Sequence, residues 1–248
     1  MVSVILPAAG RGKRMQAGVN KVFLGLLGKP ILYHTLKAFA SVPEVGELIV
    51  VTGQDEVAAL RRSLHHVPGL PQVKVVTGGS ERQYSVWNGL KASSEQADVV
   101  LVHDAARPLV SRETIEAVIA SAREFGAAIA AVPEKNTVKM VEDGIVTATP
   151  ERAKLWAVQT PQGFQRSLLV AANEKAEADG FLGTDDASLV ECYGAQAQAV
   201  MDSFQNTKIT TPEDLIVAEA FLRQRKSTKE ALQDAAAKVH DFLHNRKD

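Results

Sequence analysis

The residue types best suited to chemistry lie in a small-residue turn, residues 7–15, which follows the apolar run Val2 to Leu6. Small residues let backbone N–H groups approach phosphate oxygens, and the basic residues of the turn add positive charge. A solvated tight turn is the alternative interpretation. The candidate phosphate-binding residues are Pro7, Ala8, Ala9, Gly10, Arg11, Gly12 and Arg14.

Residue types in this turn exclude two common phosphate motifs. A P-loop needs Ser or Thr after Gly-Lys, but Arg14 follows Lys13. A dinucleotide fingerprint needs a third glycine where Met15 stands, which also disfavours an NAD-dependent oxidoreductase. The turn is therefore predicted to hold phosphates in another way.

Short β-branched runs alternate with helical patterns along the first half of the chain, and this order predicts an α/β fold with a doubly wound, mostly parallel sheet. The predicted strands are Val2 to Leu6, Glu47 to Val51, Val73 to Thr77, Val99 to His103 and Ala127 to Val132. The predicted helices are Ile31 to Phe39, Glu56 to Leu64, one capped by Ser80 and Gln83, and one after Ser111.

Asp104 follows the predicted strand Val99 to His103, at the carboxyl edge where ligands of open α/β sheets bind. A lone carboxylate acting with substrate phosphates is typical of a Mg²⁺ site, although an Asp here can also cap a turn. Neighbouring His103 is predicted to pack in the core. Asp202 is a weaker candidate as a second metal ligand.

The alternation ends after Pro133, and Asp143-Gly144 predicts a hairpin within an arm of about residues 134–157. Helices near Arg166 to Asp179 and Thr184 to Tyr193 follow, then strands at Gln196 to Met201 and Thr207 to Thr210. Thr211 begins a further helix. We therefore expect a main domain of residues 1–226 that includes the arm, and a helical extension of residues 227–248.

Bulk composition excludes several functions. The formal net charge is -1, so no global basic field favours nucleic acid or an anionic membrane. No apolar run approaches the roughly 20 residues of a membrane span. The single cysteine, Cys192, fits a reducing compartment and is expected to be a small buried hydrophobe. The cytoplasm is the expected location.

Ordered motifs give a specific resemblance. Ala8-Ala9-Gly-x-Gly-x-Arg14-Met15, with Asn20-Lys21 beyond it, resembles the signature of sugar-phosphate nucleotidyltransferases. From about Val2 to Arg223, further motifs resemble the methylerythritol phosphate cytidylyltransferases. These begin at Gly78, His103, Asn136, Gln159, Thr184 and Lys208. The resemblance implies transfer of a cytidylyl group from CTP to a sugar-alcohol phosphate.

The resemblance also implies roles for individual residues. Arg14 and Lys21 would stabilise the anionic transition state, and Asp104 would hold Mg²⁺. Gly79, Ser85 and Arg82 would surround the cytosine, with Ala105 also near CTP. The residues implied around the acceptor are Thr137, Arg152, Thr160, Thr184, Lys208 and Arg107. The arm would reach a second subunit and make a homodimer.

Two alternatives stay open at this point. Ribitol 5-phosphate cytidylyltransferases share the fold and CTP, but Ala106 and the Thr137-x-Lys139 pattern favour the methylerythritol phosphate enzymes. A non-catalytic nucleotide-binding module could keep the fold and lose the chemistry. Retention of Arg14, Lys21 and Asp104 together argues against that module.

Overall fold

The computed structural model describes residues 1–10, 20–65, 67–225 and 227–228. Its centre is a seven-stranded sheet in the order β11-β7-β10-β6-β1-β4-β5, with β10 antiparallel to both neighbours and all other pairs parallel. The strands are β1 (Val2–Pro7), β4 (Val45–Thr52), β5 (Gln72–Thr77), β6 (Val99–Val102), β7 (Ala127–Pro133), β10 (Trp156–Gln165) and β11 (Gln198–Met201). The predicted mostly parallel sheet is confirmed.

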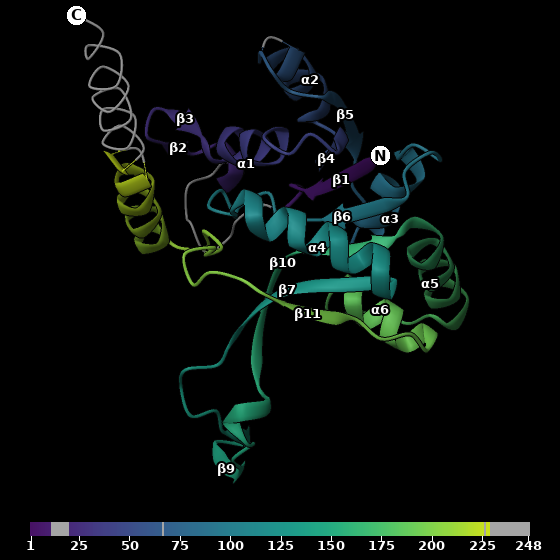
Figure 1. The fold of residues 1–248 in the computed structure, drawn as a ribbon, viewed down its shortest axis with the longest axis vertical. Helices are drawn as coiled ribbons and strands as arrows, with labels where there is room; N and C mark the ends of the chain where they lie inside the picture. The colour runs from purple at the N-terminus through teal and green to yellow at the C-terminus, as the bar shows by residue number, and fades with distance from the viewer. Residues whose placement is uncertain (11–19, 66, 226, 229–248) are drawn as a thin grey trace, which may run out of the picture.

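Helices cover both faces of this sheet (Figure 1), which confirms double winding. Apolar side chains of α1, α2 and α4 pack on one face, and those of α3, α5 and α6 pack on the other. Their bounds are α1 (Ile31–Ala40), α2 (Val57–His65), α3 (Arg82–Ala92), α4 (Arg112–Phe125), α5 (Arg166–Asp179) and α6 (Asp186–Tyr193). Strand β1 shows the alternation, because Val4 and Leu6 join the first core and Ile5 joins the second.

The arm projects from one end of the sheet as the hairpin of β8 (Met140–Glu142) and β9 (Ile145–Ala148) (Figure 1). Asp143 and Gly144 have φ of 50° and 81°, as a two-residue hairpin turn requires, so this prediction is confirmed. A short 3-10 helix, η3 (Arg152–Lys154), leads back into β10. Apolar side chains of the hairpin are exposed, including Ile145 at 69%.

Three short elements and one further helix complete the described fold. They are η2 (Lys21–Phe23), the small strands β2 (Gly25–Leu26) and β3 (Lys29–Pro30), and a helix over residues 212–225. The start of this last helix was predicted correctly. Among the described residues, no helix is both long and apolar enough to cross a membrane.

Two predicted helix caps are wrong. Glu81 precedes α3 without a side-chain cap, because the Gln83 side chain instead bonds the Phe181 carbonyl and the Gly183 N–H. Asp185, rather than Thr184, caps α6, because its carboxylate accepts from the backbone N–H of Ser188.

Two other predictions are also wrong. Residues 207–210 are not a strand, because Ile209 makes only a single pairing there, from its N–H to the Ala106 carbonyl at 2.9 Å. Cys192 is exposed near the end of α6 rather than buried. The predicted extension of residues 227–248 lies almost wholly outside the described residues, and the boundary at 226 stays a prediction.

Candidate active site

A cavity of about 270 Å³ opens at the carboxyl ends of β1, β5 and β6. The chain runs from β1 outward through β4 and β5 and then returns to β6 on the other side of β1, so the cavity lies at a switch point of the sheet. Its lining residues are Pro7, Ala8, Ala9, Gly10, Lys21, Val22, Gly79, Ser80, Glu81, Arg82, Ser85, Asp104, Ala105, Ala106 and Lys208.

The start of the small-residue turn is fixed by Asn20. Its side-chain amide donates to the Ala8 carbonyl at 2.5 Å and to the Glu56 carboxylate at 3.2 Å. The side-chain oxygen Oδ1 of Asn20 accepts from Val22 N–H and caps η2. One buried side chain therefore holds both the turn and the short helix that carries Lys21.

The segment after β5 is ordered by Ser85. The Ser85 hydroxyl donates to the Glu81 carbonyl at 3.0 Å and accepts from Gly79 N–H at 3.1 Å. A Cβ at Gly79 would lie 2.5 Å from the Tyr84 Cβ, so a side chain would not fit there without a shift. This segment therefore lines the cavity with small and polar groups, among them Gly79, Ser80 and Ser85.

Asp104 is the centre of charge in the cavity. Its Oδ2 accepts from Arg107 Nε at 3.1 Å and pairs with Lys208 Nζ at 3.0 Å. Burial would raise the pKa of Asp104, but Lys208, Arg107 and Arg82 outweigh it and hold the pKa well below its ordinary value. The carboxylate is therefore ionised at neutral pH.

The side chain of Thr160 holds the backbone at Asp104 in place. The Thr160 hydroxyl accepts from the backbone N–H of Asp104 at 3.0 Å and lies 3.0 Å from His103 Nδ1. His103 Nε2 lies 3.0 Å from the Arg107 carbonyl, which can only accept. Burial lowers the pKa of His103 to about 4, so the ring is neutral with its proton on Nε2, and Nδ1 accepts from Thr160.

Thr160 was expected beside the acceptor, but within this chain it is an internal support of Asp104. The residue is only 5% exposed, and its hydroxyl is occupied by Asp104 and His103. His103 packs its ring edge-on against Phe39 at a centroid distance of 4.8 Å, as predicted for a core residue.

Arg82 connects the cavity to α6. Its guanidinium bonds the Asp186 carboxylate at 2.7 Å, and the Asp186 side chain is 1% exposed. Burial raises the pKa of Asp186, whereas the charge of Arg82 lowers it, and burial prevails. Gln162 on β10 reinforces the same corner by accepting from Asp186 N–H at 3.1 Å.

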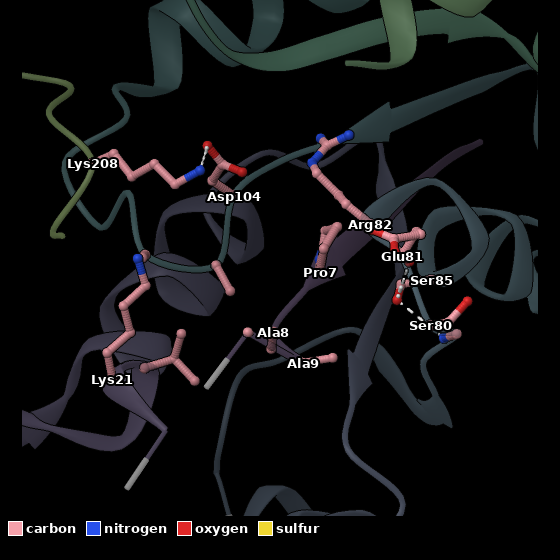
Figure 2. A pocket seen from close by; sticks show the side chains of 15 residues that line it. Pro7, Ala8, Ala9, Lys21, Ser80, Glu81, Arg82, Ser85, Asp104 and Lys208 are labelled. Atoms are coloured by element: carbon pink, nitrogen blue, oxygen red, sulfur yellow. Dashed lines mark hydrogen bonds and ion pairs between the residues drawn. The ribbon is translucent and has the colours of Figure 1, made fainter. Parts of the chain in front are cut away.

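The other predicted cations lie around the cavity. Lys21 Nζ donates to the Ile209 carbonyl at 2.9 Å, next to Lys208 in the chain. Figure 2 shows Lys208 directed at Asp104, with Lys21 and Arg82 on opposite sides of Pro7 and Ala8 in this view. Arg107 is not among the lining residues; it bonds Asp104 and also donates to the Asn206 carbonyl at 2.8 Å.

Of the six predicted acceptor residues, only Lys208 lines the cavity; Thr160 and Arg107 bond Asp104, and the other three lie elsewhere. Thr137 and Arg152 are exposed at the base of the arm, and Arg152 donates to the Lys135 carbonyl at 3.3 Å. Thr184 is exposed just before α6. The fold of one chain therefore does not bring Thr137 and Arg152 to Asp104.

Arg11, Gly12 and Arg14 lie outside the described residues. Four lining residues were not predicted as site residues: Val22, Ser80, Glu81 and Ala106. Each is next to a predicted one in the sequence, so adjacency was the available signal. Asp202 does not line the cavity, and its carboxylate accepts from Thr114, Ser203 and Asn206.

The fold and the cavity define a class. A doubly wound sheet whose switch point carries a small-residue turn, two lysines, one arginine and the carboxylates of Asp104 and Glu81 is the arrangement of a nucleotidyltransferase. The family model described as IspD, 2-C-methyl-D-erythritol 4-phosphate cytidylyltransferase, matches residues 2–224. The chain belongs to the 2-C-methyl-D-erythritol 4-phosphate cytidylyltransferase family.

Named relatives agree with this assignment. The cytidylyltransferase of that name from Geobacter metallireducens is 48% identical over 228 residues, covering 90% of this chain and 98% of the relative. Its namesake from Bacillus licheniformis is 48% identical over 223 residues, covering 90% and 96%. The crystal structure of 4-diphosphocytidyl-2C-methyl-D-erythritol synthase from Anaerococcus prevotii has a TM-score of 0.79 at 34% identity, covering 90% of this chain and 98% of that one. The chain is an enzyme that transfers a cytidylyl group.

Proposed function

We propose that the cavity binds the triphosphate of CTP and that a phosphate oxygen of 2-C-methyl-D-erythritol 4-phosphate attacks the α-phosphorus there. A new P–O bond forms to the acceptor phosphate, and the bond between the α-phosphorus and its bridging oxygen breaks, releasing pyrophosphate. The acceptor phosphate is already ionised near neutral pH, so no general base is needed. What the reaction needs is positive charge fixed around the phosphates.

One observation carries this proposal: Lys21, Arg82 and Lys208 line one cavity with Asp104 beside a turn of small residues. Lys21 supplies a compact charge to the transition state, with Arg14 as the proposed second stabilising cation. Pro7, Ala8, Ala9 and Gly10 leave room for the phosphates to approach the backbone. We assign Arg11 and Gly12 to the same turn by sequence.

Mg²⁺ is the proposed cofactor, held by Asp104 and the phosphates of CTP. Among the described residues, the side chains that contact the Asp104 carboxylate do so at Oδ2, which leaves Oδ1 as the oxygen that we propose for a metal. The described residues hold no cluster of three or more His, Cys, Asp or Glu, which fits an ion held mainly by phosphate and water oxygens. When bound, the ion would screen the repulsion between the two anionic substrates.

We assign the nucleobase to the side of the cavity formed by Gly79, Ser85 and Arg82, with Ala105 as a further lining residue near CTP. Lys208 and Arg107 would orient the acceptor phosphate at the other end of the cavity. Their shared contact with Asp104 supports this, because the carboxylate fixes both cations before substrate binds. Thr184 is the proposed hydroxyl contact on the α6 side, and Thr160 supports the site from beneath.

A homodimer would complete the acceptor site. Thr137 and Arg152 are exposed on the arm, together with an apolar hairpin surface of Met140, Val141, Ile145 and Val146. An exposed apolar surface on a projecting arm is typical of a protein–protein interface. We therefore propose that each arm carries Thr137 and Arg152 to the partner's cavity.

The cytoplasm is the proposed location. A single cysteine cannot form a disulfide within the chain, which fits a reducing compartment. Cell fractionation tests this, and recovery of the enzyme outside the cytoplasmic fraction would contradict it.

Pyrophosphate release from CTP tests the activity and the acceptor together. The enzyme should release pyrophosphate with 2-C-methyl-D-erythritol 4-phosphate and much more slowly with ribitol 5-phosphate, and removal of Mg²⁺ by a chelator should stop it. Turnover with neither acceptor would favour a non-catalytic module. Comparable turnover with ribitol 5-phosphate would contradict the acceptor assignment.

Variants test the proposed cations. Lys21→Ala and Arg14→Ala should each lower turnover by at least 100-fold, the scale at which a transition-state donor acts. Lys37 on α1 makes an exposed bond to the Pro68 carbonyl and does not line the cavity. Its alanine variant is the matched control and should keep full activity. Near-normal turnover of Lys21→Ala would remove that residue from the mechanism.

A further inference from the structure

The loop before Lys208 is held by a buried side chain that has no place in the chemistry above. Asn206 has no exposed surface, and its side-chain amide donates to the Thr160 carbonyl at 2.7 Å and to Asp202 Oδ2 at 2.6 Å. Its backbone carbonyl accepts from Arg107 Nη1 at 2.8 Å. One residue thus contacts β10, the Asp202 turn and the loop after β6.

Asp202 extends these contacts to α4. The other oxygen of its carboxylate accepts from the Thr114 hydroxyl at 2.8 Å and from Ser203 N–H at 2.6 Å. Asp202 is 8% exposed, and its own N–H bonds the β7 carbonyl of Ala131. A charged acceptor beneath the surface, with three donors on it, makes a firm anchor for Asn206.

The groups that Asn206 joins are those that surround Asp104. Arg107 and Lys208 both contact Asp104 Oδ2, and Thr160 accepts from the Asp104 backbone N–H. Asn206 contacts Arg107 and Thr160 directly and is two residues before Lys208. Ile209 on the far side of Lys208 bonds Ala106, so the chain at Lys208 is held at both ends.

We propose that Asn206, anchored by Asp202, is a positioning residue that sets where Lys208 and Arg107 present their charges. It does not touch the cavity and acts only through those two cations. This inference rests on the proposed role of Lys208 in orienting the acceptor phosphate. A displacement of about 1 Å in a positioning group can cost about 100-fold in rate.

A double-mutant cycle tests the inference. Asn206→Ala should lower kcat/KM by about 10- to 100-fold, with a rise in KM for the acceptor and little change in KM for CTP. In a Lys208→Ala background the same substitution should lower kcat/KM by a clearly smaller factor, because one of the two cations that it positions is gone.

Asn173→Ala is the matched control. Asn173 is also a buried asparagine, 3% exposed, but its amide bonds the Leu169 carbonyl within α5. This variant should lower the melting temperature and leave kcat/KM within about 2-fold. Should Asn206→Ala fail to fold, Asp202→Asn tests the same contact without opening a cavity, since its amide would face the Asn206 amide.

The outcomes separate the two claims. Wild-type kcat/KM in folded Asn206→Ala, or an undiminished effect of that change in the Lys208→Ala background, would overturn the positioning role. Wild-type kcat/KM in Lys208→Ala would instead overturn the proposed role of Lys208. A large loss of kcat/KM from Asn206→Ala in the wild-type background, together with a smaller loss in the Lys208→Ala background, would support both roles.

Discussion

Replacing Thr160 by valine should damage both stability and activity, because its hydroxyl serves two buried partners. The hydroxyl accepts from Asp104 N–H and donates to His103 Nδ1, each at 3.0 Å. Valine has a similar shape but offers neither bond. The substitution leaves a buried donor and a buried acceptor unsatisfied, and each such group costs about 1–3 kcal/mol.

We therefore expect Thr160→Val to lower the free energy of unfolding by about 3 kcal/mol. For a chain of this length, that corresponds to a fall in melting temperature of about 6–12 °C. Scanning calorimetry on the purified enzyme measures it. Activity should fall as well, because the Asp104 backbone would no longer be held against β10.

Two variants make the test specific. Thr160→Ser keeps the hydroxyl and should retain most of the stability and the activity. Thr184→Val removes an exposed hydroxyl and should change the free energy of unfolding by less than about 0.5 kcal/mol. A melting temperature of Thr160→Val within 2 °C of wild type would refute the argument that Thr160 is an internal support.

Three further predictions follow from other parts of the molecule. The pKa of His103 is lowered to about 4, so its contribution to stability is fully present above the unfolded pKa of about 6.5 and declines below it, by about 2 kcal/mol between pH 8 and pH 5; an NMR titration should find the ring neutral at pH 5, and a midpoint above pH 6 would contradict this. Gly89→Ala should cost about 1–3 kcal/mol, because its Cβ would lie 2.6 Å from Ile5 Cγ2, and an unchanged melting temperature would count against the close packing of α3 on β1. Ile145→Lys on the arm should yield a stable monomer by analytical ultracentrifugation, whereas a monomeric wild type or a dimeric variant would contradict the proposed interface.

The parallel part of the fold was predictable because its strands carry their own signal. Runs such as Val99 to Val102 are buried on both faces and read as continuous apolar segments. Helix α4 begins directly after Ser111, as predicted, and the Ser111 hydroxyl accepts from Thr114 N–H. At these positions the local sequence preferences agree with the overall fold, so the sequence alone is enough to predict the element.

Strand β10 was missed because its sequence does not resemble a strand. It contains Pro161, Gln162 and Gly163, which have low strand propensity or remove a ladder donor. The structure accommodates them with a shift in register between Val158 and Gln162 against β7. Its antiparallel place between β6 and β7 is decided by tertiary pairing, which no local pattern reports.

The same limit applies to the site. The sequence predicted Asp104 and Lys208 as functional charged residues. It could not predict that Lys208 and Arg107 both contact the same oxygen of Asp104. That sharing has a consequence for Mg²⁺. Since Oδ2 is occupied by two fixed cations, the carboxylate cannot rotate freely and would offer the metal only Oδ1, so the ion would need several phosphate or water oxygens. Its affinity in the absence of CTP should therefore be weak, and tight Mg²⁺ binding to the free enzyme would contradict this geometry.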